Sequence, residues 1–223
     1  MNKEQRALLL DMVIYKVIEL REPAYKQLPF KINLDAMETK PEVRGHVMKS
    51  LMARWISVQP DDAVALVPKG CRGLVPILAD RLGVAYLLPI ELAPDDDSPV
   101  CLYGSAKKHS NVLLICEYLR QCPPDEASFH PLVKMLNVLV SQRFDLEKVI
   151  VIFDADRDRV VSNHLNRNRF ANLQIEVIFD MREVLSDFMA NAGFYGLDQD
   201  LAARALRHYQ SKASILPPSV KTG

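Results

Sequence analysis

Short runs of Val, Ile, Leu and Ala recur along the chain. Each run is about five residues long and rich in aliphatic side chains, which is typical of strands buried on both faces of a sheet. The runs are residues 63–67, 84–88, 112–116, 149–153 and 175–179. Because segments with helical periodicity lie between most of them, the pattern predicts an α/β fold with a mainly parallel central sheet flanked by helices.

The predicted helices have apolar positions three or four residues apart. An opening helix is predicted over residues 4–19, closed by Pro23, and its apolar face is expected in the core or in a dimer interface. The other predicted helices are residues 41–55, 74–82, 132–140, 160–170, 181–192 and 198–209. We expect one domain over residues 1–210 and a disordered tail over 211–223, where the periodicity stops.

The composition and net charge of the chain argue against several classes of function. The chain has 223 residues, with 28 Lys plus Arg and 28 Asp plus Glu, so its formal net charge is zero. A neutral chain has no overall field to attract nucleic acid or an anionic membrane, and its apolar runs are far shorter than the ~20 residues that span a bilayer. None of the four cysteines belongs to a C-x-x-C pair, which argues against a zinc ribbon or a disulfide scaffold. We expect a cytoplasmic protein with no membrane or nucleic-acid partner.

Ligands of open parallel sheets bind beyond the carboxyl ends of the strands. After the first predicted strand comes the sequence Lys69-Gly70-Cys71-Arg72-Gly73, in which two glycines, two cations and the start of a helix could present N–H groups to an anion. The alternative is an ordinary strand-to-helix turn.

Two further clusters of charged residues lie near predicted strand ends. The basic run 106–109, with sequence A-K-K-H, precedes the third strand and is either solvated surface or part of a site. Asp154, Asp156 and Asp158 follow the fourth strand at alternate positions. Three carboxylates could hold a divalent cation, but the interleaved Arg157 and Arg159 can neutralise them, so no metal site is expected.

Taken in order along the chain, several segments resemble motifs of the orotate phosphoribosyltransferases, a group of type I phosphoribosyltransferases. The match covers roughly residues 5–205. The segments are Leu28–Leu34 with its Pro, Phe and Asn, Lys69–Leu74, Ile77–Leu88, Ala106–His109, Val149–Arg157 and Ile175–Leu185. The resemblance implies the type I phosphoribosyltransferase fold, with residues 1–35 forming the opening helix and a hood segment. It also implies a homodimer that transfers phosphoribose from phosphoribosyl pyrophosphate to a pyrimidine base with Mg²⁺.

The resemblance implies contacts to the reacting bond, to the pyrophosphate and to the base. Lys107 and His109 would contact the reacting bond. The pyrophosphate would be bound by Lys69, Gly70, Arg72 and Gly73, and the base by Phe30 and Arg157.

Departures from the family pattern fall where phosphate binding needs glycine. The family motif reads like V-D-D-V-x-T-x-G, whereas residues 115–122 read I-C-E-Y-L-R-Q-C, which leaves Glu117 and Arg120 as remnants on the ribose side. After His109 only two residues precede the next predicted strand, where the family has a long glycine-rich mobile loop. We therefore expect the transferase activity to be lost or weakened, with the protein acting by binding phosphate, a nucleotide or a protein partner.

Two alternatives stay open. One is an active orotate phosphoribosyltransferase of pyrimidine biosynthesis with a shorter loop. The other is a metal-dependent phosphohydrolase that uses Asp154 and Asp156.

Overall fold

The computed structural model describes residues 1–24, 27–55, 62–67, 73–91, 100–104, 106–167 and 170–211. Within these residues the chain forms a six-stranded sheet and a separate two-stranded hairpin. The strands of the large sheet lie in the order β5-β4-β3-β6-β7-β8. Their bounds are β3 Ala63–Leu66, β4 Ala85–Glu91, β5 Val100–Gly104, β6 Asn111–Leu119, β7 Asp145–Asp154 and β8 Gln174–Asp180. All neighbours pair in parallel except β4 and β5. The predicted α/β class with a mainly parallel sheet is confirmed.

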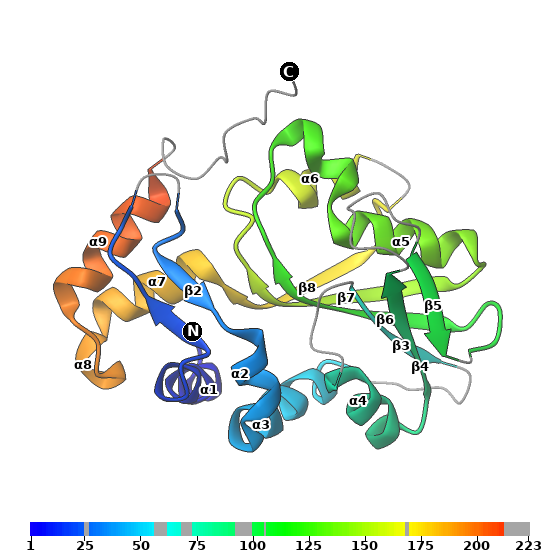
Figure 1. Ribbon diagram of the computed structural model, residues 1–223, viewed down its shortest axis with the longest axis horizontal. Helices are drawn as coiled ribbons and strands as arrows, with labels where there is room; N and C mark the ends of the chain where they lie inside the picture. Colours follow the sequence, from blue (N-terminus) through cyan, green and yellow to red (C-terminus); the bar gives the residue numbers. More distant parts are fainter. Residues whose placement is uncertain are drawn as a thin grey trace.

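Helices cover both faces of this sheet (Figure 1). Their bounds are α1 Lys3–Ile14, α2 Leu34–Thr39, α3 Pro41–Met52, α4 Leu74–Leu82, α5 Pro131–Ser141, α6 Val160–Asn166, α7 Met181–Ala190, α8 Ala192–Tyr195 and α9 Gln199–Gln210, with a 3₁₀ helix, η1, at Pro124–Phe129. Figure 1 shows α5 and α6 on one face and α1, α3 and α4 on the other.

The core is divided into two apolar clusters, one on each face. Alternate strand residues point to opposite faces. On β3, Val64 and Leu66 pack with the helices on the side of α1, α3 and α4, whereas Ala63 and Ala65 pack with those on the side of α5 and α6. Burial on both faces explains why these strands read as continuous apolar runs.

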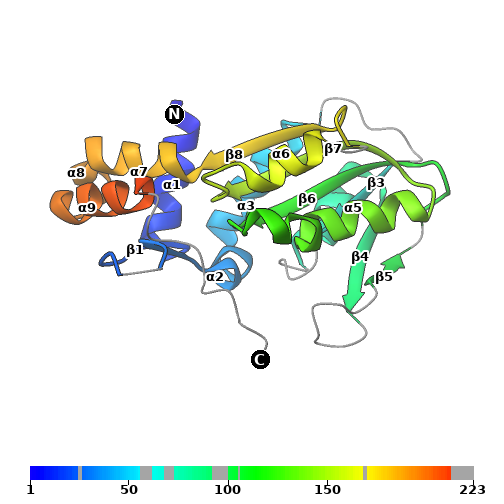
Figure 2. The ribbon, with the colours of Figure 1, turned by 90° about the horizontal axis from the view of Figure 1, so that it is seen from above.

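The two-stranded hairpin, near the start of the chain, lies beside the last helices (Figure 2). Strand β1 (Ile18–Leu20) pairs with β2 (Phe30–Ile32) in antiparallel register. Figure 2 shows this hairpin and α1 beside α7, α8 and α9, beyond the carboxyl end of β8. The sequence places a hood segment in residues 1–35, and the structure shows that helices from the last third of the chain complete this lobe.

Four predicted helices end earlier than expected, and the sixth, predicted over residues 181–192, ends at Ala190. The opening helix stops at Ile14 rather than residue 19, because residues 18–20 are hydrogen-bonded in β1. The second and fifth predicted helices end at Met52 and Asn166. The expected tail lies outside the described residues except for Ser211. No helix in the described ranges has the length and apolar character needed to cross a bilayer.

Candidate functional site

The carboxyl ends of β6, β7 and β8 meet at one edge of the sheet. Leu119 is the register partner of Asp154, and Asp154 is the partner of Asp180. Parallel pairing therefore brings together the residues that follow all three strands. A small polar cavity of about 40 Å³ lies here, lined by Asp154, Asp156, Arg157, Arg159, Asp180, Arg182 and Tyr209.

Asp154 is the last residue of β7 and faces this cavity. Burial raises its pKa to about 6, although the backbone N–H of Asp156 donates to its Oδ1 at 2.9 Å. The nearby Asp156 and Asp180 carboxylates act in the same direction as burial. An acid with a raised pKa at the ligand-binding edge of a sheet is a candidate functional group.

The Asp156 side chain has a structural role. Its carboxylate accepts the backbone N–H groups of Val160, Val161 and Ser162 at 3.0, 2.8 and 3.4 Å. It therefore serves as the cap of α6, whose first N–H groups lack helical partners. Among the described residues no group of three His, Cys, Asp or Glu side chains could hold a metal ion. The phosphohydrolase alternative relies on Asp154 and Asp156, and the Asp156 carboxylate already accepts these three N–H groups.

Both residues implied to contact the base lie around Tyr209 of α9. The Arg157 guanidinium donates to the carbonyl oxygens of Tyr209 and Ser211 at 3.2 and 2.8 Å and pairs with Asp158 at 2.7 Å. Its side chain is only 4% exposed. The Phe30 ring packs against the Tyr209 ring with centroids 5.7 Å apart. The structure brings Phe30 and Arg157 into one place, and protein groups already contact both.

The remnants of the ribose motif have different surroundings. Glu117 is buried within β6, whereas Arg120 follows the end of the strand and is exposed. Burial also raises the pKa of the neighbouring Tyr118 to about 12. Gln121 Nε2 donates to Asp158 at 3.0 Å, which ties the segment after β6 to the turn after β7.

Of the predicted anion turn, only Gly73 is described; Lys69, Gly70 and Arg72 lie outside the described residues. The Gly73 N–H, at the start of α4, donates to Oε1 of Glu38 at 2.6 Å. A Cβ at position 73 would clash with this carboxylate. The negative charge of Glu38 thus stands at the positive end of the α4 dipole, where a ligand anion was expected.

Lys107 and His109, the implied catalytic residues, lie at the opposite edge of the sheet. Strand β5 runs antiparallel to β4 and ends at Gly104, opposite Leu87, so its turn into β6 is at the amino edge. His109 N–H donates to Arg143 O at 2.8 Å there. This placement separates the two residues from the carboxyl-edge cluster. The connection that leaves the carboxyl edge between β4 and β5 is residues 92–99, outside the described residues.

Sequence reasoning missed two residues of this site. Tyr209 has the spacing of an ordinary apolar helix position, and Glu38 stands 35 residues before Gly73. No local pattern marks either residue as part of the site. Only the fold brings them to the carboxyl edge and the start of α4.

No protein-family model and no curated protein matches the sequence. Solved structures do match the fold. UMP synthase of Leishmania donovani aligns with a TM-score of 0.69 and 15% identity over 93% of this chain, which spans 42% of the synthase chain. Orotate phosphoribosyltransferases of Aeropyrum pernix and Francisella tularensis give TM-scores of 0.63 and 0.60 at 14% identity. They cover 81% and 92% of this chain and 97% and 98% of their own. The chain therefore has the type I phosphoribosyltransferase fold, as the sequence resemblance implies.

Proposed function

We propose that this protein is a phosphoribosyltransferase-like binding protein. It binds phosphate or a nucleotide through the carboxyl edge of its sheet, while transfer of phosphoribose from phosphoribosyl pyrophosphate to a pyrimidine base is lost or strongly weakened. The observation that supports this most directly is the bonding of Arg157, the cation implied to meet the base, to groups of the protein itself.

Binding a base carboxylate at Arg157 would require replacing existing contacts. The guanidinium holds the Asp158 carboxylate and two backbone carbonyls, and hydrogen bonds to charged groups contribute about 1.5–3 kcal/mol each. The Phe30 ring is also buried and in contact with the Tyr209 ring. A base entering this place must displace the end of α9, so its net affinity is low.

The segment after β6 supports the same proposal. Phosphate cradles depend on backbone N–H groups that glycine lets a ligand approach closely. Residues 119–122 carry the side chains of Leu, Arg, Gln and Cys instead, and Gln121 is bonded to Asp158. The exposed Arg120 can still attract an anion, but no cradle is formed for a 5-phosphate.

Mg²⁺ enters only in the alternative of an active transferase. The described residues offer no group of three ligands for a metal ion, and Glu117 is only 2% exposed. The described residues therefore do not fit a Mg²⁺ site held by the protein alone.

The first test is the transferase reaction itself. The protein is incubated with orotate, phosphoribosyl pyrophosphate and Mg²⁺. We expect its turnover number for orotidylate formation to be less than one tenth of the median for enzymes, which is roughly 10 s⁻¹. The measurement is the absorbance change of orotate at saturating substrates. Turnover within tenfold of that median would instead establish the active-enzyme alternative.

The second test addresses anion binding at residues 69–73. Because Glu38 already accepts the Gly73 N–H, we expect Arg72 and Lys69 to contribute most of the affinity for pyrophosphate. At 100 times its Kd, pyrophosphate should stabilise the wild type by about 2.7 kcal/mol, which raises Tm by several degrees. Arg72→Ala should reduce this rise severalfold, and Glu38→Gln should enlarge it because a competing charge is removed.

The matched control is Arg81→Ala, which removes an exposed cation from the other end of α4. Its Tm rise with pyrophosphate should equal that of the wild type. If Arg72→Ala also responds like the wild type, the turn is structural and the anion-binding part of the proposal fails.

A further inference from the structure

We infer that a cavity at the amino edge of the large sheet binds a small organic phosphate, a phosphate monoester carried on an apolar group. The cavity has a volume of about 370 Å³ and lies between the β5–β6 turn and the end of α5. It is on the opposite edge of the sheet from the site described above. The inference is therefore independent of the proposed function.

Hydrogen bonds hold the walls of this cavity together. The His109 N–H donates to Arg143 O at 2.8 Å, and the Asp145 N–H donates to Ser110 O at 3.1 Å. These bonds fasten the β5–β6 turn to the link between α5 and β7. Figure 1 shows the end of α5 beside this turn, at the right of the view. Ala106 and Lys108 of the A-K-K-H run thus line one side of this cavity.

The inner side of the cavity adjoins the apolar core, although most of its exposed lining is polar. Leu87 of β4 and Phe144 are buried residues of the core, and Leu102 of β5 packs against them. Its volume lies in the range of about 300–1,000 Å³ that is usual for small-molecule sites. Such sites combine apolar contacts with polar groups that orient the ligand, and here the partly exposed Leu102 and Ala106 supply the apolar contacts.

Two cations stand at the opening of the cavity. Lys108 and Arg143 are exposed and contribute to the lining. Within the described ranges neither side chain forms an ion pair or a hydrogen bond. Asp145, the acid beside the turn, lies 3.9 Å from His109 Nδ1. The opening therefore has two positive charges that no carboxylate neutralises.

Capping of α5 does not account for these cations. Cationic side chains often stabilise the carbonyl groups at the end of a helix. Here the carbonyls of residues 138–140 already accept the backbone N–H groups of residues 142–144. The helix end is satisfied by the chain itself, and both side chains are free to bind a ligand.

The chemistry of the cavity selects its ligand. Two adjacent cations match the double charge of a phosphate monoester, and Arg143 can donate a forked pair of hydrogen bonds to phosphate oxygens. The partly exposed side chains of Leu102 and Ala106 would contact an attached apolar ring. Inorganic phosphate lacks the ring and a neutral ring lacks the charge, so each alone should bind much more weakly.

The test is a titration of ¹⁵N-labelled protein with phenyl phosphate, followed by amide chemical shifts. Gly104, Ala106 and Phe144 line the cavity and report on it. We expect saturable shifts at these residues, and far weaker binding of inorganic phosphate and of benzyl alcohol. Lys108→Gln should weaken phenyl phosphate binding by roughly tenfold, the effect of losing one charge-assisted hydrogen bond.

Arg143→Gly is a second variant that should not harm folding. Arg143 has φ 66° just after α5, in the left-handed region that glycine adopts most easily. Its Tm should equal or exceed that of the wild type, while phenyl phosphate binds at least tenfold more weakly. Lys49→Gln, on α3, is the control for a lost surface charge and should bind normally.

Three results would overturn the inference. They are an absence of shifts at the reporter residues, wild-type affinity of Arg143→Gly for phenyl phosphate, and equal affinities for inorganic phosphate and phenyl phosphate.

Discussion

At the scale of single residues, Asp154 is a carboxyl group whose surroundings favour its protonated form. Its pKa is raised from 3.8 to about 6, first by burial. Since the folded state binds this proton more tightly than the unfolded state, the free energy of unfolding falls as pH rises from about 4 to about 6. Above pH 6 the protein carries the full cost of the buried charge.

Asp154→Asn should therefore be more stable than the wild type at pH 7.5, by about 1–2 kcal/mol, because each pKa unit corresponds to 1.36 kcal/mol and the site is partly solvated. The asparagine Oδ1 can still accept the Asp156 N–H. Urea denaturation at pH 3.5, 5 and 7.5 measures the effect, which should vanish at the lowest pH. The exposed control Asp80→Asn should show no such trend, and a less stable Asp154→Asn at pH 7.5 would contradict this assignment.

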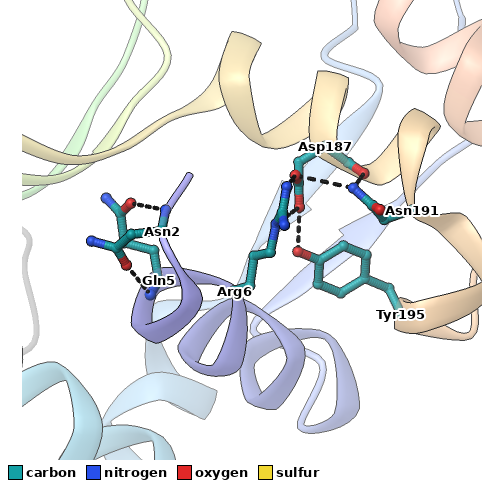
Figure 3. Close-up of polar contacts among 6 residues, drawn as sticks. All are labelled: Asn2, Gln5, Arg6, Asp187, Asn191 and Tyr195. Carbon is teal, nitrogen blue, oxygen red and sulfur yellow. Dashed lines mark hydrogen bonds and ion pairs between the residues drawn. The ribbon is translucent and has the colours of Figure 1, made fainter.

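At the scale of elements, the first helix is anchored at two places (Figure 3). Asn2 and Gln5 cap it reciprocally, and Gln5 Nε2 also donates to Ile178 O in β8 at 3.1 Å. The next residue, Arg6, donates to the Asp187 carboxylate of α7 at 2.7 and 3.0 Å. These contacts join α1 to the sheet and to the helical lobe.

Asp187 also organises the lobe internally. The Tyr195 hydroxyl of α8 donates to its Oδ2, and Asn191 Nδ2 donates to its Oδ1 at 3.2 Å. Although burial acts against ionisation, the hydrogen bonds from Arg6 and Tyr195 hold the pKa of this carboxyl below its ordinary value of 3.8. Its stabilising contribution is thus fully present above pH 4 and lost as pH falls through the lower, folded-state pKa.

We expect Asp187→Ala to lower the free energy of unfolding by about 2–3 kcal/mol, because the buried Tyr195 hydroxyl loses its partner. Glu22→Ala removes an exposed carboxylate that also pairs with an arginine, Arg204, at 2.9 Å. It is the matched control and should cost less than about 1 kcal/mol. Chemical denaturation at pH 7 compares the two, and equal losses would mean that the Asp187 cluster has no special role.

At the scale of the whole molecule, we predict a homodimer. The fold is that of the orotate phosphoribosyltransferases compared above, and the sequence resemblance implies a dimer. Large apolar side chains remain exposed on the single chain, among them Ile14, Tyr103 and Phe194. Light scattering at micromolar concentration should give twice the chain mass of 25.2 kDa. A mass equal to that of one chain would contradict the prediction.

Periodicity in the sequence determines the fold class and the strands at the centre of the sheet. Those strands are buried on both faces, so each reads as a continuous apolar run. The sequence pattern does not reveal strands β1, β2 and β5, because each lies at an edge and is partly exposed, so it lacks a continuous apolar run. Without β5, the A-K-K-H run is matched to the family's catalytic segment by resemblance alone, and the structure places this run at the amino edge of the sheet.

The candidate site, too, is predicted by the sequence only in part. The cluster of charges after β7 can be predicted from the sequence, because its residues are neighbours in the chain. What each charge does was decided by tertiary contacts: Arg157 binds carbonyls 52 and 54 residues away, and Glu38 reaches an N–H 35 residues away. Sequence patterns carry periodicity and local spacing, and they contain no signal for such pairs. Only the tertiary contacts of Glu38 in α2 with the start of α4, and of Arg157 with the end of α9, determine which of these charged groups are bound within the protein.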